Sequence, residues 1–333
     1  MIHDKQRLKE LQALPLERKI MITQARIIEW YNHYKGQVYV SFSGGKDSTV
    51  LLDIARKCFP DIEAVFVNTG LEYPEIQQFV KSFDNVTILR PKMRFDEVIK
   101  KHGYPLISKQ VSKTVSAARR LDSKYGDVCR GRLEGIELLD SGKKSLYNCP
   151  KYKPLLDVDF EVSNRCCDVM KKNPAHDYTK KSGKTPITAT MTDESMLREK
   201  VWLQNGCNAF DAKNPISNPM SFWTEQDVLQ YIKRYDLPIA SVYGEIVYET
   251  DKLTTTGCKR TGCIFCAFGC HLEKEPSRFQ MLKETHPRQY SYCIGGGEFN
   301  ENGIWQPSKD GLGMGYVFDE LNKIYGENFI RYK

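Results

Sequence analysis

The chain has 333 residues, of which 41% are hydrophobic and 27% are charged. This length can bury a substantial core in one large domain or two moderate ones. The formal net charge of +7 permits a polyanionic substrate without requiring one. No run of about 18 apolar residues occurs, and the first residues lack the apolar core of a signal peptide. We therefore expect a cytoplasmic protein that does not bind membranes.

Strand and helix patterns alternate along the first part of the chain. An amphipathic helix is predicted over Leu16–Tyr34, and strands are predicted at Val38–Phe42, Ile62–Val67 and Val86–Leu89, with helices at about 46–58 and 74–84 between them. This alternation predicts a doubly wound, mainly parallel α/β sheet, which binds ligands at the carboxyl ends of its strands. We expect a helical segment over residues 1–35, a nucleotide-binding domain over 36–240 and a cysteine-rich region over 241–333.

A glycine turn follows the first predicted strand and reads Ser43-Gly44-Gly45-Lys46-Asp47-Ser48. A strand that runs through such a turn into a helix gathers unpaired backbone N–H groups and the positive end of the helix dipole, which favours polyphosphate binding. We expect positive φ angles at both glycines, a point charge from the lysine and hydroxyl donors from the two serines.

Asp47 is the unusual member of this turn, because a carboxylate beside phosphates is unfavourable. We expect it either to cap the following helix or to contact Mg²⁺ indirectly. An ordinary strand-turn-helix would explain two glycines alone, whereas the full six-residue string favours nucleotide binding.

The string resembles the PP-loop, the pyrophosphate-binding signature of the adenine nucleotide alpha-hydrolase superfamily, and differs from the Walker loop in the spacing of its glycines. The resemblance implies cleavage of ATP between its α and β phosphates, with Mg²⁺. Asn68-Thr69-Gly70 follows the second predicted strand and is either a helix-entry turn or a contact to adenosine. The nucleotide-binding residues that we predict are Ser41, Ser43, Gly44, Gly45, Lys46, Asp47, Ser48, Asn68, Thr69 and Gly70.

Basic residues recur at partly helical spacing from residue 109 to residue 132: Lys109, Lys113, Arg119, Arg120, Lys124, Arg130 and Arg132. A solvated helix face explains most runs of this kind. The functional alternative is a basic strip that binds phosphates of a nucleotide or of a nucleic acid.

Four cysteines, Cys258, Cys263, Cys266 and Cys270, lie within thirteen residues, and the vicinal pair Cys166-Cys167 lies upstream. Reduced thiols at this density indicate metal or sulfur chemistry more than disulfides. The block from Cys258 to Cys270 alone could bind zinc, whereas a four-iron cluster accepts cysteines from distant segments. Trp223 is predicted to be a core residue, with Thr224 as N-cap of a helix over Glu225–Tyr235.

An ordered set of strings resembles phosphoadenosine phosphosulfate (PAPS) reductases and their relatives over roughly residues 36 to 270. The strings are Asn68–Glu75, Gly103-Tyr104-Pro105, Ile107-Ser108-Lys109, Arg165-Cys166-Cys167, Asp193-Glu194-Ser195 with Arg198, and Ser221–Val228. Adenylylsulfate reductases bind a four-iron cluster through a vicinal Cys-Cys and a later CxxC. By this resemblance the predicted ligands are Cys166, Cys167, Cys263 and Cys266, with Cys258 and Cys270 as alternates, and iron–sulfur is favoured over zinc.

Two departures from the reductases determine the predicted activity. The chain lacks their C-terminal Glu-Cys-Gly-Leu-His string, since its last thiol is Cys293, and its phosphate loop is intact with Lys46 in place. We therefore expect an ATP pyrophosphatase that adenylates an acceptor oxygen for iron–sulfur-assisted sulfur transfer. Lys46 and Asp47 act at the loop, and Lys109 or Arg198 steadies the α-phosphate.

Relatives with an intact loop and such cysteines include DNA phosphorothioation proteins, which implies a cysteine desulfurase partner and a nucleic-acid acceptor; a homo-oligomer is also compatible. Two alternatives stay open. One is a PAPS or adenylylsulfate reductase of sulfate assimilation with Cys293 or Cys270 as nucleophile. The other is a non-catalytic subunit that binds ATP and a desulfurase.

Overall fold

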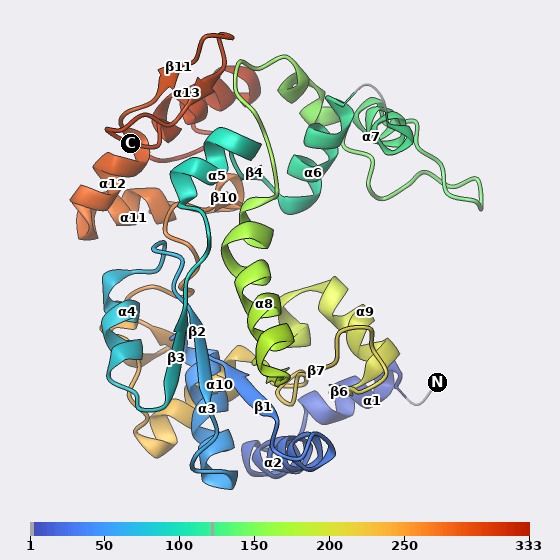
Figure 1. Ribbon diagram of the computed structural model, residues 1–333, viewed down its shortest axis with the longest axis vertical. Coiled ribbons are helices and arrows are strands. Elements are labelled where there is room, and N and C mark those ends of the chain that lie inside the picture. Colours follow the sequence, from blue (N-terminus) through green and yellow to red (C-terminus); the bar gives the residue numbers. More distant parts are fainter. Residues whose placement is uncertain (1–2, 121–122) are drawn as a thin grey trace. The chain divides into compact units, whose positions relative to one another are not determined.

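The computed structural model describes residues 3–120 and 123–333, so residues 1–2 of the predicted helical segment lie outside it. The chain forms two compact units (Figure 1). The first contains the chain up to Asn68, Glu72–Arg90 and Pro174–Gly262, and the second contains Thr69–Leu71, Pro91–Asn173 and Cys263–Lys333. This division differs from the predicted linear one, because the chain leaves the first unit near residue 90 and returns at residue 174.

The first unit contains a six-stranded sheet in the order β3-β2-β1-β5-β7-β6. Its strands are β1 (Val38–Ser41), β2 (Ala64–Val67), β3 (Val86–Leu89), β5 (Thr185–Ile187), β6 (Asn208–Ala209) and β7 (Ile216–Ser217). All neighbouring strands pair in parallel except β6, which is antiparallel to β7. The predicted mainly parallel, doubly wound sheet is confirmed, and the order reverses between β1 and β5, where such sheets bind ligands.

Helices of the first unit cover this sheet. They are α1 (Lys5–Gln12), α2 (Leu16–His33), α3 (Lys46–Cys58), α4 (Pro74–Lys81), α8 (Asn173–Ser182), α9 (Met196–Asn205) and α10 (Glu225–Tyr235). The first residue of α8, Asn173, is the last residue that belongs to the second unit before the chain returns to the first. A hairpin of β8 (Ile246–Glu249) and β9 (Lys252–Thr255) follows α10. Val38, Tyr39 and Val40 are all at most 2% exposed, so both faces of β1 are covered.

The second unit is mainly helical. Its helices are α5 (Phe95–His102), α6 (Lys109–Ala118), α7 (Lys124–Glu134), α11 (Arg278–Thr285), α12 (Pro287–Ile294) and α13 (Met314–Tyr325). Its strand pairs are β4 (Leu106–Ile107) with β10 (Ala267–Phe268), which is parallel, and β11 (Glu298–Phe299) with β12 (Trp305–Gln306), which is antiparallel. Short helical turns occur across both units at Pro150–Leu156, Asp168–Lys172, Thr192–Glu194, Ser241–Tyr243 and Cys270–Leu272.

No helix in the described part of the chain is long and apolar enough to cross a lipid bilayer.

A buried ion pair fixes the start of α10 against α2. Lys19 is 2% exposed, and its Nζ lies 2.6 Å from Oδ2 of Asp227. The same carboxylate accepts the Thr224 N–H at 2.7 Å, and the Thr224 hydroxyl accepts the Asp227 N–H at 3.4 Å. The predicted bounds and cap of this helix are confirmed, and Trp223 is fully buried as predicted. The pair positions Glu225, the first residue of α10.

We expect Asp227→Ala to lower the free energy of unfolding by about 3–5 kcal/mol, because it leaves the buried Lys19 ammonium without its counter-ion. Urea unfolding measures the change. The double variant Lys19→Met/Asp227→Asn should recover at least half of the loss. Glu10→Ala, which removes the exposed Arg7–Glu10 pair, should cost no more than about 1 kcal/mol. Equal losses for Asp227→Ala and Glu10→Ala would contradict a stabilising role for the buried pair.

Candidate functional site

The glycine turn lies between the carboxyl end of β1 and the start of α3, as predicted. Gly44 has φ +71°, and a Cβ at this position would lie 2.7 Å from Val80 Cγ2 and 2.8 Å from Ile76 Cγ2. Gly44 therefore needs both the left-handed conformation and the absence of a side chain. The expected positive φ at Gly45 is wrong: this residue is the extended N-cap of α3, with φ −77°.

Hydroxyl groups hold the turn in shape from within. The Ser48 hydroxyl donates to the Gly45 carbonyl at 2.9 Å and accepts the Ser43 N–H at 3.1 Å. The Thr49 hydroxyl also donates to the Gly45 carbonyl, at 3.0 Å. The two predicted serines thus act first on the backbone of the loop.

Lys46 lies at the centre of the site, with 4% of its side chain exposed. Its Nζ donates to the Lys259 carbonyl at 2.9 Å and lies 3.1 Å from Oε1 of Glu225. Its backbone N–H, the first of α3, donates to the Tyr243 hydroxyl at 3.2 Å, and that hydroxyl lies 2.6 Å from Oγ1 of Thr261. Groups of the protein therefore occupy the donors that would face a phosphate.

Sequence reasoning missed three of these neighbours: Glu225, Tyr243 and Thr261. Glu225 belongs to the string Ser221–Val228, which had been noted only for its resemblance and its helix cap. No sequence signal marked Tyr243 or Thr261, because they lie about two hundred residues beyond the loop.

Asp47 occupies the first turn of α3, so the predicted N-cap role is wrong. Its Oδ1 is buried and has no hydrogen-bond partner among the described residues, while the side chain as a whole is 30% exposed. Burial raises the pKa of this carboxyl, and the nearby Lys46 charge opposes the shift. Lys46 Nζ lies 3.9 Å from this oxygen, too far for a hydrogen bond. A carboxylate oxygen without a hydrogen bond at a phosphate loop suits a cation, so the predicted Mg²⁺ contact fits the donor chemistry.

Two arginines add positive charge near the loop. Arg198, in the first turn of α9, pairs with Glu194, whose other oxygen lies 3.6 Å from Arg260 Nη1. Burial lowers the pKa of Arg198, and the charges of both arginines act to lower the pKa of Asp47. Arg198, which was predicted, therefore acts on the loop through its charge. Arg260 acts in the same way and was not predicted.

The other predicted nucleotide contacts follow β1 and β2. Ser41 ends β1, and Asn68, whose N–H donates to the Leu89 carbonyl at 2.9 Å, directly follows β2 at the same sheet edge. Thr69 and Gly70 belong to the second unit, where the Thr69 hydroxyl accepts the Leu71 N–H at 3.1 Å and Gly70 has φ +75°.

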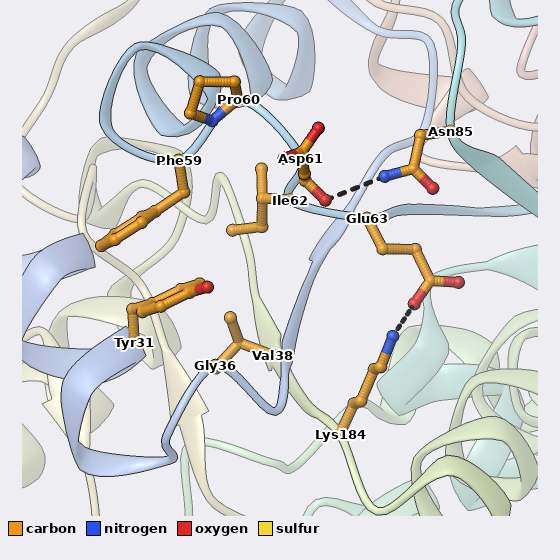
Figure 2. Close-up of a pocket in the computed structure, with 10 residues that line it drawn as sticks. All are labelled: Tyr31, Gly36, Val38, Phe59, Pro60, Asp61, Ile62, Glu63, Asn85 and Lys184. Atoms are coloured by element: carbon orange, nitrogen blue, oxygen red, sulfur yellow. Dashed lines mark hydrogen bonds and ion pairs between the residues drawn. The ribbon is translucent and has the colours of Figure 1, made fainter.

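A cavity of about 440 Å³ lies at the amino-terminal ends of the strands of this sheet (Figure 2). Its lining residues precede or begin the strands: Tyr31, Gly36, Val38, Phe59, Pro60, Asp61, Ile62, Glu63, Asn85 and Lys184. Lys184 Nζ donates to Glu63 Oε2 at 2.6 Å, and the Asn85 amide donates to the Asp61 carbonyl at 2.9 Å. Parallel sheets bind ligands at carboxyl ends, so we do not assign the nucleotide to this cavity.

Gly44→Ala should weaken nucleotide binding at least tenfold and lower the free energy of unfolding by about 1–3 kcal/mol, because it combines left-handed strain with a clash against α4. Gly45→Ala is the matched control, since its Cβ would lie 3.2 Å from Ser43 Oγ and 3.3 Å from Tyr243 Oη, contacts that shifts of a few tenths of an ångström in these side chains relieve, and its φ is not in the left-handed region. The control should keep its unfolding free energy within about 0.5 kcal/mol. Calorimetric titration with ATP measures nucleotide binding, and urea unfolding measures the free energy of unfolding. If Gly44→Ala changes neither quantity, the assigned loop geometry is contradicted.

The four predicted metal ligands converge in the second unit. Cys166, Cys167, Cys263 and Cys266 line one cavity of about 20 Å³, together with Leu71, Phe95, Pro105, Met170 and Lys171. The Cys266 N–H donates to the Cys263 carbonyl at 3.0 Å, and the Ile264 N–H donates to the Leu71 carbonyl at 2.8 Å. These bonds fix the backbone of the CxxC segment, whose two cysteines line the same cavity as the vicinal pair.

The vicinal thiols differ in acidity. A hydrogen bond from Cys166 and the positive charges of Lys109 and Lys171 lower the pKa of Cys167 to about 6. The pKa of Cys166 is raised, first by donating that hydrogen bond and then by burial. These effects favour the thiolate form of Cys167, which is the form that binds metals. Lys109, predicted to steady the α-phosphate, lies beside this thiolate in the second unit.

The alternate ligands lie elsewhere. Cys270 is 3% exposed, and its thiol donates to the Ala267 carbonyl at 3.0 Å. Cys258 belongs to the first unit. Across the described residues, no group of three or more His, Cys, Asp or Glu side chains is arranged to hold a single metal ion, and no disulfide joins any of the eleven cysteines. The donor set of four thiols suits thiolate ligation of a metal.

Three of the seven residues of the predicted basic strip form contacts within the fold of the second unit. Arg119 donates to the carbonyls of Phe160, Leu155 and Val158 at 2.8–3.1 Å. Arg130 donates to the Ala118 carbonyl at 2.7 Å, and Arg132 forms a bidentate pair with Glu137 at 2.9 Å. These contacts favour a structural role for the three arginines over phosphate binding.

Comparison with known proteins gives the family. The model of the phosphoadenosine phosphosulfate reductase domain matches residues 37–126 and 109–268, which is more than half of the chain. The chain belongs to this family. The matched region contains the phosphate loop, both predicted cysteine pairs and Glu225, Tyr243 and Thr261 beside the loop.

Individual relatives are distant. An uncharacterized protein of Methanocaldococcus jannaschii is 24% identical over 84% of this chain and 52% of its own length. The adenosine 5'-phosphosulfate reductase of Staphylococcus haemolyticus is 26% identical over 66% of this chain and 70% of its own length. The sulfate adenylyltransferase subunit 2 of Agrobacterium fabrum is 25% identical over 61% of this chain and 56% of its own length. The chain thus spans about half to two thirds of these relatives.

A crystal structure of the PAPS reductase of Candida auris in a phosphate complex aligns with 75% of this chain and 97% of that chain, at 16% identity and a TM-score of 0.38. Two of these relatives are named for reactions of sulfate nucleotides.

Proposed function

We propose that this protein is an ATP pyrophosphatase that adenylates an acceptor oxygen for sulfur transfer. The observation that supports this best is the intact phosphate loop, in which Gly44 has φ +71° and the buried Lys46 projects from the first turn of α3. Loop amides and a lysine at a helix start suit the two terminal phosphates of ATP. A relative named as a sulfate adenylyltransferase subunit supports adenylyl transfer in this family.

In the proposed reaction an acceptor oxygen attacks the α-phosphorus, the bond between the α- and β-phosphates breaks, and pyrophosphate leaves. Lys46 and the N-terminal amides of α3 hold the leaving group, and Arg198 offsets charge that develops at the α-phosphate. Asp47 would hold Mg²⁺, which neutralises part of the charge of the phosphates when it is bound. The acceptor replaces one P–O bond by another, so no redox change occurs in this step.

The burial of two thiols argues against the reductase alternative. A sulfonucleotide reductase needs an accessible nucleophilic cysteine, and the candidates are Cys293 and Cys270. Cys293 is 0% exposed and Cys270 is 3% exposed, and burial raises the pKa of both. Buried thiols with raised pKa are poor nucleophiles. Adenylation by ATP therefore has more support than the reductase alternative.

The thiol set of the second unit supports a four-iron cluster, as in the reductases that the chain resembles. Cys166, Cys167, Cys263 and Cys266 provide four sulfur donors around one cavity whose walls include Leu71, Phe95 and Met170. The cavity of about 20 Å³ holds no more than a water molecule, so the four thiols must move apart when a cluster is inserted.

The acceptor is an oxygen nucleophile. In the sulfur-transfer step, the terminal sulfur of a desulfurase persulfide would attack the activated centre, AMP would leave with the oxygen, and a thiol reductant would cleave the S–S bond and leave the sulfur on the acceptor. Nucleic acid is the acceptor that the resemblance to DNA phosphorothioation proteins suggests. Because Arg119, Arg130 and Arg132 have structural roles, these three arginines of the basic strip do not support a nucleic-acid acceptor.

Lys46→Ala should weaken MgATP binding by about ten- to a hundredfold, because it removes a charge-assisted contact to the terminal phosphates. Isothermal titration measures the binding, and mass spectrometry of the turned-over nucleotide should find AMP and pyrophosphate instead of ADP and phosphate. Lys57→Ala, at the other end of α3, is the matched control and should bind ATP normally. Equal affinity in the Lys46→Ala and wild-type proteins, or ADP as product, would refute the proposal. Binding without turnover would instead identify the non-catalytic ATP-binding subunit.

Protein purified anaerobically should contain iron and sulfide and absorb broadly near about 400 nm. Cys263→Ser and Cys266→Ser should lose this absorption, because each removes a thiolate ligand, while Cys270→Ser and Cys258→Ser should retain it. Removal of iron by a chelator should bleach the wild type. A colourless protein with stoichiometric zinc would contradict the cluster.

A further inference from the structure

One carboxylate beside the phosphate loop, that of Glu225, has no role in the proposed reaction. Glu225 Oε1 lies 3.1 Å from Lys46 Nζ, at the position where an oxygen of a bound phosphate would approach. The lysine side chain is 4% exposed and that of Glu225 is 44% exposed. The cation is thus fixed inside the protein, while its partner can swing into solvent.

We propose that Glu225 is a displaceable counter-ion that takes the place of pyrophosphate on Lys46 and thereby promotes release of that product. The inference rests on the proposed function, because it concerns the leaving group of the same reaction. When the terminal phosphates of ATP enter, the carboxylate leaves Lys46; when pyrophosphate departs, it returns.

The physical reason is the cost of an unpaired buried cation. Without Glu225, departing pyrophosphate would leave the Lys46 ammonium with one hydrogen-bond acceptor, the neutral Lys259 carbonyl at 2.9 Å, and with the Asp47 carboxyl group at 3.9 Å, which is beyond hydrogen-bond distance and whose pKa is raised by burial. A buried charge without a counter-ion is expensive, so release would be slow. Glu225 removes this cost by supplying an anion from within the protein.

The surroundings let Glu225 move while Lys46 stays in place. Glu225 is the first residue of α10, whose start is fixed by the Lys19–Asp227 pair and the Thr224 capping box. Its side chain lines an open cavity of about 450 Å³ that is also bounded by Leu229, Glu249, Asp251 and Lys259. The carboxylate therefore has space to rotate into without any change in the helix.

The loop amide is occupied in a parallel way, which supports the same interpretation. The Tyr243 hydroxyl accepts the Lys46 N–H at 3.2 Å, and Tyr243 itself is 2% exposed. Thus both donors of Lys46, its amide and its ammonium, have an oxygen acceptor when no nucleotide is bound. Of these acceptors, Glu225 is the one that carries a charge.

The test is a titration of the full-length protein with inorganic pyrophosphate and with ATP, followed by isothermal calorimetry. Glu225→Gln keeps the shape of the side chain and removes the competing charge, so both ligands should bind about tenfold more tightly than to the wild type. Inhibition of turnover by added pyrophosphate should increase by the same factor. The difference between the two proteins should narrow between about 50 and 500 mM salt, because one partner is solvent-exposed.

The matched control is Glu249→Gln, which makes the same charge change in the same cavity but at a residue without a contact to Lys46 among the described interactions. Its affinities should stay within about twofold of the wild type; a tenfold gain here would show a general field effect and overturn the proposal.

Other outcomes separate this proposal from the proposed function. If the wild type binds ATP in a Lys46-dependent way and Glu225→Gln binds pyrophosphate equally or less tightly, Glu225 orients the lysine or holds Mg²⁺, and only the release role fails. Titrations repeated without Mg²⁺ in EDTA should retain the tenfold gain. If neither protein binds ATP or pyrophosphate, the phosphate loop is not a nucleotide site and both proposals fail. Thermal unfolding of each variant verifies that it is folded.

Discussion

The organisation of the first unit depends on one buried cation, the ammonium of Lys46. A lysine that is 4% exposed must have anionic or strongly polar partners, and the fold provides them from distant parts of the chain. The Glu225 carboxylate comes from α10 and the Lys259 carbonyl from the segment after β9. The N-terminus of α10 is in turn anchored to α2 by Lys19 and Asp227. The helices α2 and α10 therefore help to hold a polar environment around a single side chain.

Elements with strong local signals could be predicted from the sequence. The strand β3 and the helix α10 were predicted at their observed bounds, and the observed bounds of α3 also agree with the predicted ones. These elements could be predicted because alternation, helical periodicity and a Thr-x-x-Asp cap are encoded locally. The conformation of Gly45 and the N-cap alternative for Asp47 were predicted wrongly. Both depend on where α3 begins: with Gly45 as N-cap, Asp47 falls inside the first turn and no longer caps the helix.

Long-range contacts account for what sequence reasoning missed. Tyr243 and Glu225 meet Lys46 from about two hundred residues away, and no spacing rule connects them. The same limit affected the basic strip, since helical spacing cannot reveal that Arg119 donates to three backbone carbonyls. By contrast, the convergence of the vicinal cysteines with the CxxC was predicted, but through resemblance to a family and not through the residues alone.

The eleven cysteines illustrate how burial separates chemical roles within one residue type. Cys293 is fully buried beside Met314, a setting that suppresses the thiolate and suits packing. Cys167 instead lies within reach of Lys109 and Lys171, and its pKa falls to about 6. Thiolate chemistry in the second unit is therefore concentrated at the site lined by Cys166, Cys167, Cys263 and Cys266. These four thiols are the donors that a metal or sulfur function in the second unit would have available together, whereas the last thiol of the chain contributes to the core.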